Sequence, residues 1–118
     1  MRVVLVTGGF DPIHSGHIAY FNEAKKLGDT LVVGVNSNEW LARKKGQPFM
    51  DINERVEIVK NLSVVDSVMV FDDSDGGASQ AIQNCLTMYP DSEIIFANGG
   101  DRTNDNIPEM KIKDKRLS

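Results

Sequence analysis

Four short apolar runs alternate along the chain with segments of helical periodicity. The runs cover residues 2–6, 31–35, 68–71 and 94–97, and their β-branched content favours buried strands. Apolar residues recur at helical spacing over residues 18–27, 52–62 and 78–89, as is typical of amphipathic helices. Residues 39–43 predict one further short helical turn. This alternation predicts an α/β fold with a parallel sheet and crossover helices.

The segment of residues 8–17, GGFDPIHSGH, follows the first predicted strand and opens the first predicted helix. Ser15 is the predicted N-cap, so free N–H groups and the positive end of the helix dipole lie nearby. His14 and His17 are three residues apart with a glycine before the second, which allows both rings to face one phosphate. We therefore expect an anionic ligand here, with histidine donors aimed at charge on a phosphoryl oxygen.

Two alternatives for the histidine pair stay open. Zinc binding is a poor match, because no cysteine or carboxylate pattern accompanies the spacing of His14 and His17; no metal ligands are predicted. The second alternative is a purely structural pair that caps a helix.

Ligands of open parallel sheets bind beyond the carboxyl ends of the strands, where the strand order reverses. Four segments are expected there: residues 8–17, residues 36–45, the acidic loop after Phe71, and residues 98–102. In the second segment, Lys44 and Lys45 belong to a predicted basic loop, which either contacts phosphate groups or is simply solvated.

Several single residues allow two interpretations. Arg55 either contacts substrate or pairs with Asp51 at i, i+4. Asp11 either holds the glycine loop or binds substrate. Asp101 either contacts the ligand or caps a following helix. Trp40 lines the mouth of the site, forms a subunit contact or is an ordinary half-buried aromatic residue.

The segment of residues 8–17 resembles the signature of the cytidylyltransferase-like nucleotidyltransferases: a glycine turn, Phe-Asp, two residues, then His-x-Gly-His. The small bacterial glycerol-3-phosphate cytidylyltransferases are the most similar members. The similarity extends from Val3 to about Asp101 and includes the lysine at Lys44 and the pair Glu54-Arg55, which opens a later helix.

This resemblance implies a Rossmann-like sheet with helices on both faces. It also implies transfer of a nucleotidyl group from CTP or another nucleoside triphosphate, with Mg²⁺, to a phosphorylated small molecule, with release of pyrophosphate. A homodimer is expected, as is common among such proteins. The implied catalytic residues are His14, His17 and Lys44. The implied nucleotide-binding residues are Gly8, Gly9, Phe10, Asp11, His14, His17, Asp101 and Arg102, and the implied substrate-binding residues are Asp11, Lys44, Lys45 and Arg55.

The sequence also departs from the family pattern. Gly9 stands where threonine is common, and the Asp11-Pro12 pair is closer to adenylyltransferase relatives, so CTP and ATP both stay open. The basic residues that the glycerol-phosphate enzymes carry near Gly46 and Ser63 are absent, which argues against glycerol 3-phosphate as the acceptor. The family continues into a further strand and a phosphate-gripping segment; we expect either a shortened protein or a minimal variant that uses Arg102 and Thr103.

Composition sets outer bounds. A length of 118 residues predicts a single domain, residues 1–118. A net charge of -4 argues against nucleic acid as a partner. No apolar run could span a membrane, and the single Cys85 fits the reducing cytoplasm. The predicted function is nucleotidyl transfer, with an inactive nucleotide-binding module and a plain interaction domain as alternatives.

Overall fold

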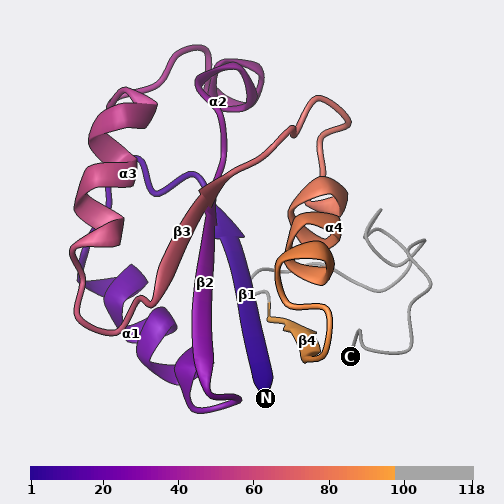
Figure 1. The fold of residues 1–118 in the computed structure, drawn as a ribbon. Coiled ribbons are helices and arrows are strands. Elements are labelled where there is room, and N and C mark those ends of the chain that lie inside the picture. Colours follow the sequence, from indigo (N-terminus) through magenta and orange to yellow (C-terminus); the bar gives the residue numbers. More distant parts are fainter. Residues whose placement is uncertain (98–118) are drawn as a thin grey trace.

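A computed structural model describes residues 1–97 and contains a four-stranded parallel sheet (Figure 1). The strands, in the order β3-β2-β1-β4, are β1 (Arg2–Gly8), β2 (Thr30–Val35), β3 (Ser67–Val70) and β4 (Glu93–Phe96). Because β2 and β4 flank β1 on opposite sides, the strand order reverses beside β1. The carboxyl end of β1, where the histidine motif begins, therefore lies where open parallel sheets bind ligands.

Helices cover both faces of the sheet, which confirms the predicted Rossmann-like α/β architecture. In Figure 1, α1 and α3 lie against one face and α4 against the other, while α2 lies beyond the carboxyl ends of the strands. Their bounds are α1 (Ser15–Lys25), α2 (Asn38–Lys45), α3 (Ile52–Lys60) and α4 (Ser79–Met88). Within the described residues, none of the helices has the length and apolar character needed to cross a membrane.

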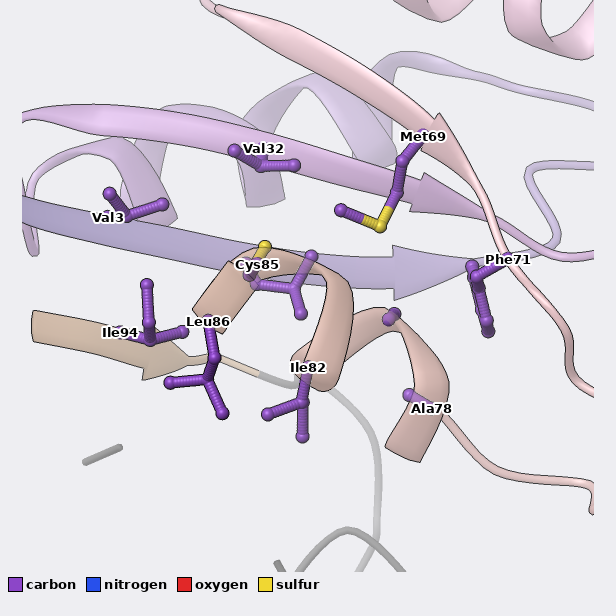
Figure 2. Close-up of a cluster of buried hydrophobic side chains, with 11 residues drawn as sticks. Val3, Val32, Met69, Phe71, Ala78, Ile82, Cys85, Leu86 and Ile94 are labelled. Carbon is purple, nitrogen blue, oxygen red and sulfur yellow. The ribbon is translucent and has the colours of Figure 1, made fainter. Parts of the chain in front are cut away.

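Strand β1 is buried on both faces, because alternate residues of a strand point to opposite sides. Val3 packs under α4 with Ile82 and Cys85 (Figure 2), and Leu5 belongs to the same cluster. The intervening residues of β1 pack under α1 and α3. Cys85 is completely buried, which raises the pKa of its thiol to about 12 and confirms its predicted core position. This double-sided core fixes the strand that carries the motif.

The structure corrects the predicted boundaries of two helices. Helix α2 replaces the short turn expected over residues 39–43, because Ser37 caps its start and Gly46, with φ 97°, ends it. Lys44 and Lys45 therefore lie in the last turn of a helix and not in a flexible loop. Helix α1 ends at Lys25, so the predicted apolar stripe over residues 18–27 is only partly buried.

Candidate active site

The glycine turn after β1 is shaped by a buried aromatic ring. Phe10 has a positive φ of 52°, and its ring meets His17 and Phe21 edge-on at 5.2 Å between centroids in each case. A Cβ added to Gly8 would lie 2.9 Å from this ring, so a larger residue there would displace the ring. The turn is therefore fixed by Phe10 packing beneath it, and Phe10 supports the site from below.

The two histidines close the N-terminus of α1 by capping each other. The His14 Nδ1 atom accepts the Gly16 N–H at 3.0 Å, and the His17 Nδ1 atom accepts the His14 N–H at 3.1 Å. The result is a capping box in which histidine takes both side-chain positions. The predicted N-cap was Ser15; the correction to His14 follows from the extended backbone of His14, whose ring reaches the N–H two residues on.

This arrangement fixes the proton on each ring. A nitrogen that accepts a backbone N–H carries a lone pair and no proton, so each neutral imidazole holds its proton on Nε2. The ring centroids of His14 and His17 lie 4.0 Å apart. The helix N-terminus thus carries two neighbouring Nε2–H donors, in addition to its own N–H groups and dipole.

The charge state of His17 supports this assignment. Partial burial lowers the pKa of His17, and the neighbouring His14 lowers that pKa further. A lowered pKa favours the neutral ring near neutral pH, which is the state the capping box requires. The functional and structural interpretations of the pair are therefore compatible, since the same bonds that cap the helix set the donors.

Asp11 clamps a distant loop onto the motif. Its carboxylate accepts the N–H groups of Phe49 at 2.6 Å and Met50 at 2.5 Å and pairs with Lys45 Nζ at 2.6 Å, with the carboxylate only 1% exposed. Burial raises the pKa of Asp11, but the hydrogen bonds from Lys45, Phe49 and Met50 outweigh it, so the net pKa is lowered. Asp11 therefore holds the loop before α3 as an anion.

Arg55 lies beneath the same loops and is completely buried. Its guanidinium donates to the carbonyls of Gly9 at 2.9 Å, Asn36 at 2.6 Å and Met50 at 2.9 Å, and to Asn38 Oδ1 at 2.8 Å. Burial lowers the pKa of Arg55, yet a guanidinium stays charged in proteins. Because the side chain is buried and four of its five N–H donors are engaged within residues 1–97, we assign Arg55 a positioning role in place of the expected substrate contact.

The expected pairing of Arg55 with Asp51 is also replaced. The Asp51 carboxylate caps α3 by accepting the Asn53 N–H at 2.9 Å and accepts the Asn38 amide at 2.8 Å. Asn38 thus bridges Asp51 and Arg55 through the two ends of its amide. The start of α2 is joined to the start of α3 by this bridge.

Asp73, in the acidic loop after β3, was not singled out from the sequence. It is buried, and its carboxylate accepts the Asn36 amide at 3.0 Å, the Ser37 N–H at 2.8 Å and the Ser37 hydroxyl at 2.7 Å. Arg43 donates to the Asp73 carbonyl at 3.0 Å. The sequence offered one signal for Asp73, which is its place directly after an apolar strand. Asp72 has the same place, so this signal does not single out Asp73.

The two predicted lysines have different surroundings. Lys45 is held by the Asp11 carboxylate and by the Asp11 carbonyl, the latter at 2.9 Å. Lys44 Nζ lies 4.6 Å from the centroid of the Trp40 ring. The structure therefore brings both lysines to the edge of the sheet where the motif lies, but it engages only Lys45 with a carboxylate among residues 1–97.

The remaining candidates fall outside what the structure describes. Asp101, Arg102 and Thr103 lie beyond residue 97, as does the C-terminal segment, and their predicted roles stay predictions. Within residues 1–97, no three His, Cys, Asp or Glu side chains gather in a group that could hold a metal ion.

Comparisons with known proteins point to one family. Residues 5–115 match the cytidylyltransferase-like family. The bifunctional protein HldE of Syntrophotalea carbinolica is 37% identical over 107 residues, which cover 89% of this chain and 20% of that protein. HldE of Helicobacter pylori is 36% identical over 119 residues, which cover 98% of this chain and 24% of that protein. The chain thus spans less than a quarter of the length of these curated relatives.

One solved structure is similar over nearly the whole chain. The lipopolysaccharide core biosynthesis protein from Thermoplasma volcanium superposes with a TM-score of 0.71 at 28% sequence identity. The match covers 99% of this chain and 93% of that one.

Replacing Arg55 with lysine should lower the free energy of unfolding by about 3 kcal/mol or more, since one ammonium cannot reach carbonyls on several segments and leaves buried acceptors unsatisfied. Chemical denaturation measures this loss. The control is Lys60→Ala, an exposed residue of the same helix that pairs with Glu57, which should change stability by about 0.5 kcal/mol at most. Equal effects of the two substitutions would contradict the role given to Arg55.

Stability should depend on pH through His17. The pKa of His17 is lowered from 6.5 in the folded state, so the unfolded chain binds the proton more readily. The stability that the neutral His17 ring contributes is complete above pH 6.5, and it is lost as the pH falls from 6.5 through the lowered pKa of the folded state. Thermal unfolding between about pH 8 and about pH 5 measures it.

His17→Gln is the matched variant for this pH measurement. Glutamine at the third helical position can still accept the N-cap N–H but does not titrate. The variant should therefore show a flatter dependence of the unfolding temperature on pH over this window. An unchanged slope would show that His17 does not cause the effect.

Proposed function

The chain belongs to the cytidylyltransferase-like family, and we propose that it is a nucleotidyltransferase acting on a phosphorylated small molecule. The observation that carries the proposal is the pair of Nε2–H donors at the start of α1. The centroids of the two rings lie 4.0 Å apart, and the rings lie at the end of the parallel sheet where ligands bind. Donors fixed by backbone hydrogen bonds need no reorganisation when charge develops on a substrate.

The proposed reaction is a direct displacement at the α-phosphorus of a nucleoside triphosphate. A phosphate oxygen of the acceptor forms the new bond to this phosphorus, while the bond to the bridging oxygen breaks and pyrophosphate leaves. His14 and His17 donate Nε2–H groups to the charge that accumulates on the phosphate oxygens, and Lys44 adds a positive charge. No protein nucleophile takes part, because positioning and charge stabilisation suffice for in-line transfer.

Mg²⁺ is proposed to arrive with the triphosphate. Magnesium ions in such sites take most of their oxygen ligands from substrate phosphates and water, with one or two carboxylates at most. When bound, the ion neutralises phosphate charge, which is the chemistry it would supply here.

CTP is the first nucleotide we propose and ATP the second. The family description supports cytidylyl transfer, whereas the Asp11-Pro12 pair is closer to adenylyl-transferring relatives. For the acceptor we propose a sugar phosphate, since the structural relative carries the description of a lipopolysaccharide core biosynthesis protein and that core is built from sugars.

Two substitutions at His17 test the chemistry while keeping the helix cap. Glutamine and glutamate can both accept the N-cap N–H, but glutamate presents only acceptors and a negative charge to the phosphates. We expect His17→Glu to lower kcat by about 10²–10³-fold or more, and His17→Gln to lower it less. Release of pyrophosphate, measured with CTP or ATP and a panel of sugar phosphates, gives the rates.

Thermal-shift measurements with nucleotide and Mg²⁺ accompany the kinetics, because binding to the native state raises its stability. Lys60→Gln, on the exposed side of α3, is the control and should leave both readouts unchanged. Nucleotide binding without turnover on any acceptor would favour an inactive binding module. The absence of any nucleotide binding by the wild-type protein would contradict the proposed function.

A further inference from the structure

Trp40 connects the glycine turn to Lys44. A Cβ added to Gly9 would lie 3.5 Å from the Trp40 ring, so the indole packs against the turn that leads into the histidine motif. On its face the same ring carries the ammonium of Lys44, with Nζ 4.6 Å from the centroid. The side chain therefore bridges two parts of the proposed site that are far apart in sequence.

Trp40 is held by one hydrogen bond at its backbone and one at its ring. Its backbone N–H donates to the capping Ser37 Oγ at 3.0 Å, and its indole Nε1–H donates to the Gly76 carbonyl at 3.4 Å. Ser37 is itself held by Asp73. Trp40 is thus hydrogen-bonded to the loops that follow β2 and β3, and the Lys44 ammonium lies over the face of its ring.

Lys44 differs from its neighbour in what balances its charge. Lys45 forms an ion pair with Asp11, whereas no carboxylate within residues 1–97 lies at ion-pair distance from Lys44. An aromatic face attracts an ammonium through its quadrupole but does not neutralise it. The Lys44 charge accordingly stays available to an anionic ligand, while its flexible stem is already restrained.

We propose that Trp40 is a positioning residue that holds the Lys44 ammonium beside the glycine turn for the triphosphate. This inference rests on the proposed function. A lysine side chain has a flexible four-carbon stem, and ordering it on binding costs affinity. The indole orders it beforehand, so Trp40 acts on the nucleotide only through Lys44.

The test is a double-mutant cycle on affinity for the nucleotide that the wild-type protein binds, CTP or ATP with Mg²⁺. Trp40→Leu should weaken binding by about two- to fivefold, the range of an exposed cation–π contact. Lys44→Met should weaken binding at least as much, and adding Trp40→Leu to Lys44→Met should have no further effect. Trp40→Phe, which keeps an aromatic face, should restore most of the affinity.

Lys45→Met provides the matched control for coupling. Because Lys45 is held by Asp11 and not by the indole, its effect and that of Trp40→Leu should simply add. Thermal unfolding of each variant identifies any loss of fold.

A second readout does not depend on nucleotide. The aromatic ring should shift the NMR signals of the Lys44 methylene next to the ammonium upfield by its ring current, in wild type and Trp40→Phe but not in Trp40→Leu. Additive losses for Trp40→Leu and Lys44→Met, or no ring-current shift, would overturn the inference while leaving the proposed function intact. A wild-type protein without nucleotide affinity would instead overturn the proposed function, and the inference with it.

Discussion

The guanidinium of Arg55 is a buried positive charge bound almost entirely by neutral oxygens. It joins the carbonyl of Gly9 in the motif, the carbonyl of Asn36 after β2, the side chain of Asn38 in α2 and the carbonyl of Met50 before α3. Removing a charge from water is costly unless its donors are satisfied, so this cation is stable only when these segments are assembled together. The loops at the carboxyl end of the sheet are consequently ordered as one unit.

Two carboxylates complete this unit from either side. Asp11 fixes the loop before α3 to the glycine turn, and Asp73 fixes the start of α2. Helix α2 and the residues that follow Gly8 lie outside the sheet, and these polar contacts, with the packing of Trp40, Leu41 and Phe10, hold them against it. The two histidine rings are held in fixed orientations, because the backbone N–H groups that their Nδ1 atoms accept both belong to the start of α1.

The sequence predicted well what hydrophobic periodicity controls and poorly what buried polar groups control. All four strands and α4 were expected within one or two residues of their observed bounds, because apolar runs and stripes report burial directly. Arg55 sits at a helical position whose charge suggests a solvated face, and its complete burial depends on carbonyls contributed by distant loops. The preference of serine for N-caps likewise concealed the cap made by the ring of His14.

The segment with Lys44 and Lys45 is a second place where the sequence-based prediction was wrong. Basic residues beside glycine and proline suggested a loop, but the cap from Ser37 and the turn at Gly46 extended α2 through Lys45. Lys44 contacts Trp40, which lies four residues earlier in the same helix, so this pair is local in the sequence. The partner of Lys45 is Asp11, which lies far away in the sequence and is brought to Lys45 only by the fold.

The central claim is that His14 and His17 act as neutral Nε2–H donors to a triphosphate. Long-range proton–nitrogen NMR correlations of the two imidazoles, recorded near neutral pH before and after addition of nucleotide with Mg²⁺, test it directly. We expect both rings to carry their proton on Nε2, because each Nδ1 accepts a backbone N–H, and we expect the Nε2 signals to shift on binding. Protons on Nδ1, or signals that nucleotide leaves unchanged, would contradict the account.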